Sequence, residues 1–226
     1  MKKYTEQLGL LSGIAAIAAV CLALFSSGCG NTPGYKEADK TGASMNSLSY
    51  EAINVKHAVN ATITSLDGIA ASAATDPRPA YEKFAKSVDD LEAAGKRAQQ
   101  LATQMNEKGT AYLETWQKQL DTVENAEIRE IAENRQAEIR EHFSAIKDVA
   151  SEAKTTFPVF LSSVKDLRTF LGADLTVNGI KAAQPSIDDA KSRGVSCQKA
   201  MDKLVDKLAA VKTAITAARV TPAAAQ

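Results

Sequence analysis

The side chain with the clearest chemistry in this sequence is the thiol of Cys29. It follows a basic start, Lys2 and Lys3, and an uncharged apolar run from Leu8 to Phe25. A basic stretch followed by an apolar stretch and small residues is typical of an export signal, which is removed and takes no part in the fold. An apolar run of about 18 residues could also remain as a membrane-spanning anchor.

The small residues directly before Cys29 favour processing at this cysteine. Ser26, Ser27 and Gly28 precede it, and the segment resembles the lipobox of bacterial lipoprotein precursors, which ends in Gly or Ala and then Cys. Ser26 departs from the pattern, which usually has Leu there. The resemblance implies a signal peptide over residues 1–28 and a diacylglyceryl thioether on Cys29. An uncleaved helix and release by ordinary signal peptidase remain as alternatives.

A lipid on Cys29 would fix the location of the protein. Each buried methylene contributes about 0.8 kcal/mol, so two or more acyl chains such as palmitate hold a protein on a bilayer. Gly30 follows the cysteine where Asp would retain a lipoprotein at the inner membrane, so the resemblance implies the bacterial outer membrane, facing the periplasm. Residues 29–43 are mostly polar with Gly and Pro and predict a flexible tether.

Other catalytic or metal-binding patterns are missing from the sequence. The two histidines, His57 and His142, have Asn54 and Ile139 three residues before them, whereas a di-iron bundle needs Glu at that spacing. Glu138 lies four residues before His142, but an ordinary helix-surface pair explains it better than a metal ion. There is no nucleophile elbow or phosphate-binding loop. We expect no enzyme, no metal and no cofactor.

The composition predicts thin helical packing. The chain has 27 basic and 27 acidic side chains, so it has no electrostatic attraction for nucleic acid. Aromatic residues make up only 5% of it, and alanine is abundant, which favours closely packed helices over a thick core. Cys197 is the one cysteine beyond Cys29, and we interpret it as a buried small residue, with an intermolecular bridge as the alternative.

Apolar residues recur every three or four positions through most of the chain, as in the heptad seam of a coiled coil. The pattern breaks at residues 75–79, 121–125 and 172–179, where prolines, glycines and capping residues gather. Residues 44–218 are therefore predicted to form an all-α, elongated, antiparallel four-helix bundle with coiled-coil-like heptad seams. Residues 219–226 read as a disordered tail, and Pro158 predicts a kink or a local break in the third helix.

Arg135 is unusual because it occupies an apolar position of the third stripe, after Ile128 and Ile131. Folding the second and third helices back about residue 123 brings Arg135 opposite Tyr112, with Trp116 one turn away. Stacking of the guanidinium on these rings, with a nearby Glu as acceptor, is the structural interpretation. A ligand or partner site built from Tyr112, Trp116 and Arg135 is the alternative.

Three motifs resemble a family of bacterial proteins grouped as domain of unknown function 2959. They are Tyr112-Leu-Glu-Thr-Trp116, Asn125-Ala-Glu-Ile-Arg129 followed by Arg135, and Asp174-Leu-Thr176 before Gly179, within a region from about Tyr50 to Leu208. The resemblance implies a helical envelope protein, often a lipoprotein, without assigned catalytic residues.

The sequence as a whole favours a membrane-anchored structural or adaptor protein of the bacterial envelope. Its helical surface would meet an envelope protein or a second copy of itself. A binding module for a small or lipidic ligand, in which the helices part to expose the alanine-rich interior, is the alternative.

Overall fold

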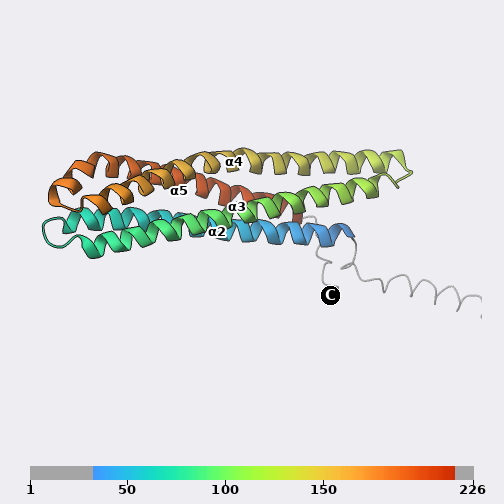
Figure 1. Ribbon diagram of the computed structural model, residues 1–226. Coiled ribbons are helices and arrows are strands. Elements are labelled where there is room, and N and C mark those ends of the chain that lie inside the picture. The colour runs from blue at the N-terminus through green and yellow to red at the C-terminus, as the bar shows by residue number, and fades with distance from the viewer. Residues whose placement is uncertain (1–32, 217–226) are drawn as a thin grey trace, which may run out of the picture.

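The computed structural model describes residues 33–216, which form four long helices and no strand. The helices are α2 (Pro33–Ser72), α3 (Arg78–Leu120), α4 (Ala126–Ala173) and α5 (Val177–Thr216). They run in alternating directions and form an elongated bundle (Figure 1), in which α2 and α4 each pack on both α3 and α5. This confirms the predicted all-α helical bundle. With 48 residues, α4 is about 70 Å long.

The helix boundaries coincide with the three predicted breaks. Asn125 caps α4, and its side-chain oxygen accepts a hydrogen bond from the backbone N–H of Ile128 at 3.0 Å. Thr176 precedes α5, and its Oγ1 accepts from the N–H of Gly179 at 3.1 Å. A side-chain acceptor at these positions satisfies an amide that has no partner inside the helix.

The predicted seam of α2 is buried along its length. Its residues from Leu48 to Ile69 are at most 3% exposed: Leu48, Ala52, Val55, Val59, Thr62, Leu66 and Ile69. Small polar side chains fix how α2 lies against α3. The hydroxyls of Ser65 and Ser87 are 3.0 Å apart, and the Thr62 hydroxyl donates to the backbone oxygen of Ser87 at 3.3 Å.

The predicted tether over residues 29–43 is wrong for residues 33–43, because α2 begins at Pro33. Proline suits the first turn of a helix, where its missing N–H has no intrahelical partner. Ala38 and Thr41 are buried, and the Thr41 hydroxyl donates to the backbone oxygen of Lys108 on α3 at 3.3 Å. A few small side chains that pack on α3 thus make a polar segment part of the bundle.

Pro158 does not break the third helix, because α4 runs uninterrupted from Ala126 to Ala173. Pro185 likewise lies inside α5 without ending it. Phe160 and Val164, which follow Pro158, are fully buried against the neighbouring helices. Tertiary packing of this kind outweighs the backbone hydrogen bond that a proline removes.

Candidate functional site

Cys29 lies outside the described residues, but the position of α2 limits where it can be. The helix starts at Pro33, four residues after the cysteine. An extended chain spans at most about 3.6 Å per residue, so Cys29 lies within about 14 Å of the first residue of α2. A lipid on this cysteine would therefore hold the bundle close to the bilayer by the end at which α2 begins.

Arg135 joins α4 to the end of α5. Its Nη1 pairs with a carboxylate oxygen of Glu138 at 2.7 Å, and its Nη2 donates to the backbone oxygen of Ala214 at 3.1 Å. Ala214 lies two residues before Thr216, the last described residue of α5. The guanidinium therefore connects α4 to the last described turn of α5.

Tyr112 and Trp116, the other two members of the predicted cluster, are in contact on α3. Their ring centroids are 5.7 Å apart with an angle of 55° between the planes. Burial raises the pKa of the Tyr112 hydroxyl, and the nearby positive charge of Arg135 opposes that rise. The structure thus brings Arg135 near Tyr112, while the hydrogen bonds of its guanidinium go to Glu138 and to α5.

Ile128 and Ile131 are exposed, contrary to the burial that their place on the third stripe predicts. Their exposed fractions are 55% and 64%. Ile131 lies about one turn before Arg135 and Ile128 about two turns before it. Both are on the face of α4 that α5 covers further along the bundle. Because the described part of α5 ends at Thr216, near Arg135, it does not reach this part of the stripe.

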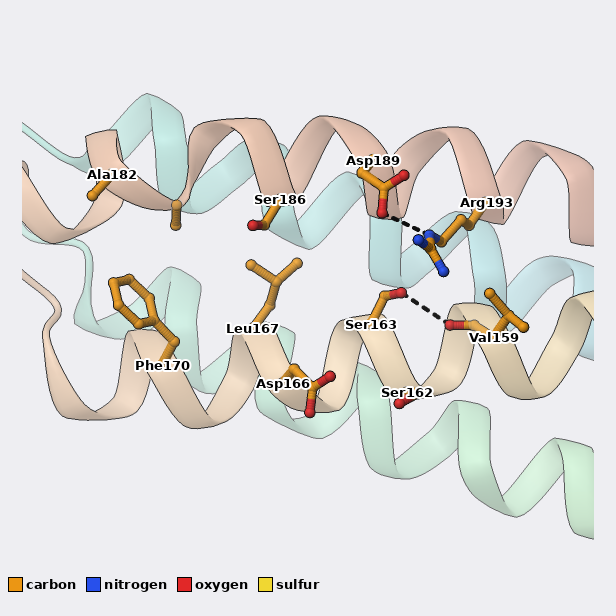
Figure 2. A pocket seen from close by; sticks show the side chains of 11 residues that line it. Val159, Ser162, Ser163, Asp166, Leu167, Phe170, Ala182, Ser186, Asp189 and Arg193 are labelled. Atoms are coloured by element: carbon orange, nitrogen blue, oxygen red, sulfur yellow. Dashed lines mark hydrogen bonds and ion pairs between the residues drawn. The ribbon is translucent and has the colours of Figure 1, made fainter.

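A groove runs along the surface between α4 and α5 near the opposite end of the bundle (Figure 2). Its volume is about 590 Å³, and Val159 and Phe170 on α4 lie towards its two ends. Their exposed fractions are 41% and 43%, and the side chain of Leu167 points into the space between them. The groove therefore offers apolar contacts about three helical turns apart.

Small side chains on both helices create this groove. Ser162 and Ser163 on α4 and Ala182, Ala183 and Ser186 on α5 line it, and side chains this small leave the space between the helices unfilled.

The charges around the groove are few and partly paired. Asp166 is exposed on α4, and Asp189 pairs with Arg193 on α5 at 2.6 Å. The rim thus has one more carboxylate than guanidinium. No periodic signal in the sequence predicts the groove, because serine and alanine at these positions are equally ordinary on a solvated helix face.

Residues 33–216 contain no cluster of three His, Cys, Asp or Glu side chains that could hold a metal ion. Glu138, which the sequence places near His142, pairs with Arg135 instead. Cys197 is fully buried, and burial raises its thiol pKa to about 11, although a hydrogen bond with Thr156 opposes the rise. None of the four described helices contains an apolar stretch long enough to cross a membrane.

A comparison with known protein families matches residues 49–218 to the family described as "Protein of unknown function (DUF2959)". The chain belongs to the DUF2959 family. The matched region runs from within α2 past the last described residue of α5, so it includes both helices that line the groove. The predicted resemblance is confirmed. No curated protein and no solved structure matches the chain.

Proposed function

We propose that this DUF2959 protein is a lipid-anchored adaptor of the bacterial envelope. A thioether on Cys29 holds the bundle on the outer membrane, facing the periplasm, and the groove between α4 and α5 binds a helix of a partner protein. The groove is the observation that carries the proposal, because it exposes apolar side chains along the axis of the bundle.

A helix suits the groove better than an extended peptide does. Two antiparallel helices with small facing side chains leave a furrow into which the side chains of a third helix can pack. Val159 and Phe170 would meet apolar residues about three turns apart on that helix. The exposed carboxylate of Asp166 favours a basic residue beside them.

The length of the bundle separates the groove from the anchored end. Between Ile128, near the turn that joins α3 and α4, and the groove residues Val159 to Phe170, α4 rises by roughly 45 to 65 Å. A partner in the groove would therefore be held far from the membrane surface. The proposed role is one of binding and spacing, without catalysis.

The alternative of a carrier for a small or lipidic ligand gains less support from the interior. Phe157 fills the space beside Gly95, and Phe143 fills the space beside Gly109. The helices would have to expel these rings to open a central site. The groove has a volume in the range of small-molecule sites, so a ligand there is an outcome that the experiments must separate.

Membrane fractionation tests the anchor. The wild-type chain and a Cys21→Ala control, whose substitution lies in the signal segment, are expected in the membrane fraction. A Cys29→Ala variant is expected to lose the lipid and to leave the membrane after high-salt washing. If Cys29→Ala stayed bound like the wild type and its mass showed that residues 1–28 had been removed, the lipid anchor would be disproved.

Site-specific photocrosslinking in intact cells tests the groove. A photoreactive residue at Val159 or at Phe170 is expected to trap the same partner, and Asp166→Lys is expected to abolish that product. Val195, which is 45% exposed on α5 outside the groove, is the matched control position. Equal trapping at Val195 would refute the groove as the binding surface, and native mass spectrometry that finds a retained small molecule in it would favour the carrier.

A further inference from the structure

The bundle extends past the first residue of α2 at the end where α3 meets α4 (Figure 1). The hydrogen bond from Thr41 on α2 to the backbone oxygen of Lys108 on α3 fixes the axial register of these two antiparallel helices. Pro33 is eight residues before Thr41, so it lies level with Trp116, eight residues after Lys108. The α3–α4 turn begins at Asp121, and at about 1.5 Å per residue it lies about 7 Å beyond the start of α2.

Ile128 lies at the level of this turn. The side chain of Gln136 donates to the backbone oxygen of Leu113 at 3.2 Å, which sets the level of α4 against α3. Ile128 is eight residues before Gln136 on α4, and Asp121 is eight residues after Leu113 on α3. Because the two helices are antiparallel, Ile128 and Asp121 lie at the same height along the bundle. Ile131 is one turn further back, so the two most exposed isoleucines of the described chain stand at this end of the bundle.

The predicted lipid site is attached to the same end. Cys29 is within about 14 Å of Pro33, whereas the turn with Ile128 reaches about 7 Å beyond Pro33 in the direction of the bundle axis. The headgroup layer of each leaflet is itself about 5–7 Å thick. When the bundle axis lies along the membrane normal, the anchor therefore holds the turn within about 7 Å of the level of Cys29.

We propose that the α3–α4 turn, with Ile128 and Ile131, is a second membrane contact that inserts into the headgroup layer beside the lipid anchor. The inference rests on the proposed lipid at Cys29. A short linker makes the contact effectively intramolecular, so even two apolar side chains suffice to hold the turn at the surface.

The negative charge of the α3–α4 turn indicates which lipid headgroups it can approach. Residues 121–133 contain five carboxylates, from Asp121, Glu124, Glu127, Glu130 and Glu133, but only one basic side chain, Arg129. An anionic bilayer would repel this end, and the repulsion would weaken at high salt. The contact is therefore made with zwitterionic lipid.

The test uses the full lipidated chain reconstituted in phosphatidylcholine vesicles. A fluorophore is attached to Ile128→Cys in a Cys197→Ala background, with circular dichroism to confirm that the bundle is intact. The matched control carries the fluorophore at Val177→Cys, an exposed apolar position at the opposite end of the bundle. Two quenchers are compared, iodide in the water and a spin-labelled lipid in the bilayer.

Severalfold stronger quenching by the lipid at Ile128→Cys than at Val177→Cys is the expected result. Adding phosphatidylglycerol at low salt should reduce it, and increased quenching would overturn the choice of a zwitterionic surface. Quenching by iodide alone would show that the turn stays clear of the bilayer. Protection from both quenchers would show that protein covers Ile128, whether a second copy or residues 217–226. Either result overturns the membrane contact.

Vesicle flotation separates this inference from the proposed function. If the chain failed to float with the vesicles, the lipid anchor itself would be wrong. If it floated while the fluorophore at Ile128→Cys behaved like the one at Val177→Cys, the anchor would stand and the second contact would fall.

Discussion

The ring of Phe157 on α4 occupies the space that a side chain at Gly95 on α3 would need. A Cβ placed on Gly95 would lie 2.2 Å from Cζ and 2.4 Å from Cε1 of that ring. The glycine therefore permits the close approach of an aromatic side chain to the backbone of α3. This contact is one of those that join α3 to α4.

Gly95→Ala is expected to destabilise the bundle. Displacing the ring should cost about 1–3 kcal/mol, partly offset by the roughly 1 kcal/mol by which alanine favours a helix. Gly68→Ala is the control, because its Cβ would meet only Ala80 at 3.9 Å, an ordinary contact. Urea denaturation should show a lower midpoint for Gly95→Ala and an unchanged or higher one for Gly68→Ala. A stabilised Gly95→Ala would mean that the ring moves aside without cost.

The sequence predicts the face on which Gly95 lies but not its partner. Periodicity shows which positions turn inward, and the breaks show where helices end. The level of α3 against α4 depends on the geometry of the turn and on contacts such as that of Gln136 with Leu113, which periodicity does not contain.

Periodicity also fails to predict the exposure of Ile128 and Ile131 and the presence of the groove, because both depend on which helix packs against which face. The two isoleucines continue a seam, but a seam is buried only where a partner helix reaches it, and the described part of α5 ends too early. The groove is lined by small side chains from two helices, among them Ser163 on α4 and Ala183 on α5. Each is unremarkable alone, so only the assembled pair of helices reveals the space.

Arg97→Met is expected to destabilise the bundle more than removal of an ordinary surface charge. Arg97 on α3 pairs with Glu51 on α2 at 2.9 Å, and the side chain of Glu51 is only 9% exposed. Without Arg97, Asn54 still donates to that carboxylate at 3.1 Å, but its charge is left without a cation. We expect a loss of about 1–3 kcal/mol in the free energy of unfolding.

A double-mutant cycle checks this explanation. Glu51→Met combined with Arg97→Met removes both charges, and it should recover part of the stability that Arg97→Met loses. Lys96→Met is the control, because Lys96 is exposed and its partner Glu92 still pairs with Lys165, so the loss should be less than about 1 kcal/mol. Equal losses in Arg97→Met and Lys96→Met would show that the burial of Glu51 has no energetic consequence.

Arg135→Met is expected to loosen the end of α5. It removes the donor to the backbone oxygen of Ala214 and the partner of Glu138, which should cost about 1–2 kcal/mol. Hydrogen exchange at the amides of α5 around Ala214 should accelerate, and the melting temperature should fall. Arg140→Met is the control, since that guanidinium bonds Gln136 on its own helix. An unchanged melting temperature together with a lost partner in crosslinking would make Arg135 a binding residue instead.

Cys197 is expected to resist alkylation in the folded bundle. Burial raises the pKa of its thiol to about 11, so at pH 8.5 the thiolate fraction, which is the reactive form, falls by roughly 100-fold relative to an ordinary cysteine. Peptide mass spectrometry after iodoacetamide treatment should show slow labelling that becomes fast in urea. The neighbouring exposed position, as Ser196→Cys in a Cys197→Ala background, is the control and should label quickly without urea.

The same raised pKa gives the stability of the bundle a pH dependence at the alkaline end. The folded state favours the protonated thiol, so this contribution to the free energy of unfolding is complete below the ordinary pKa of about 9 and is lost as the pH rises towards 11. Cys197→Ala should therefore lose less stability than the wild type between pH 9 and 11, measured by urea denaturation. Parallel losses in the two proteins, or rapid labelling of Cys197 without urea, would mean that the thiol reaches solvent between α4 and α5.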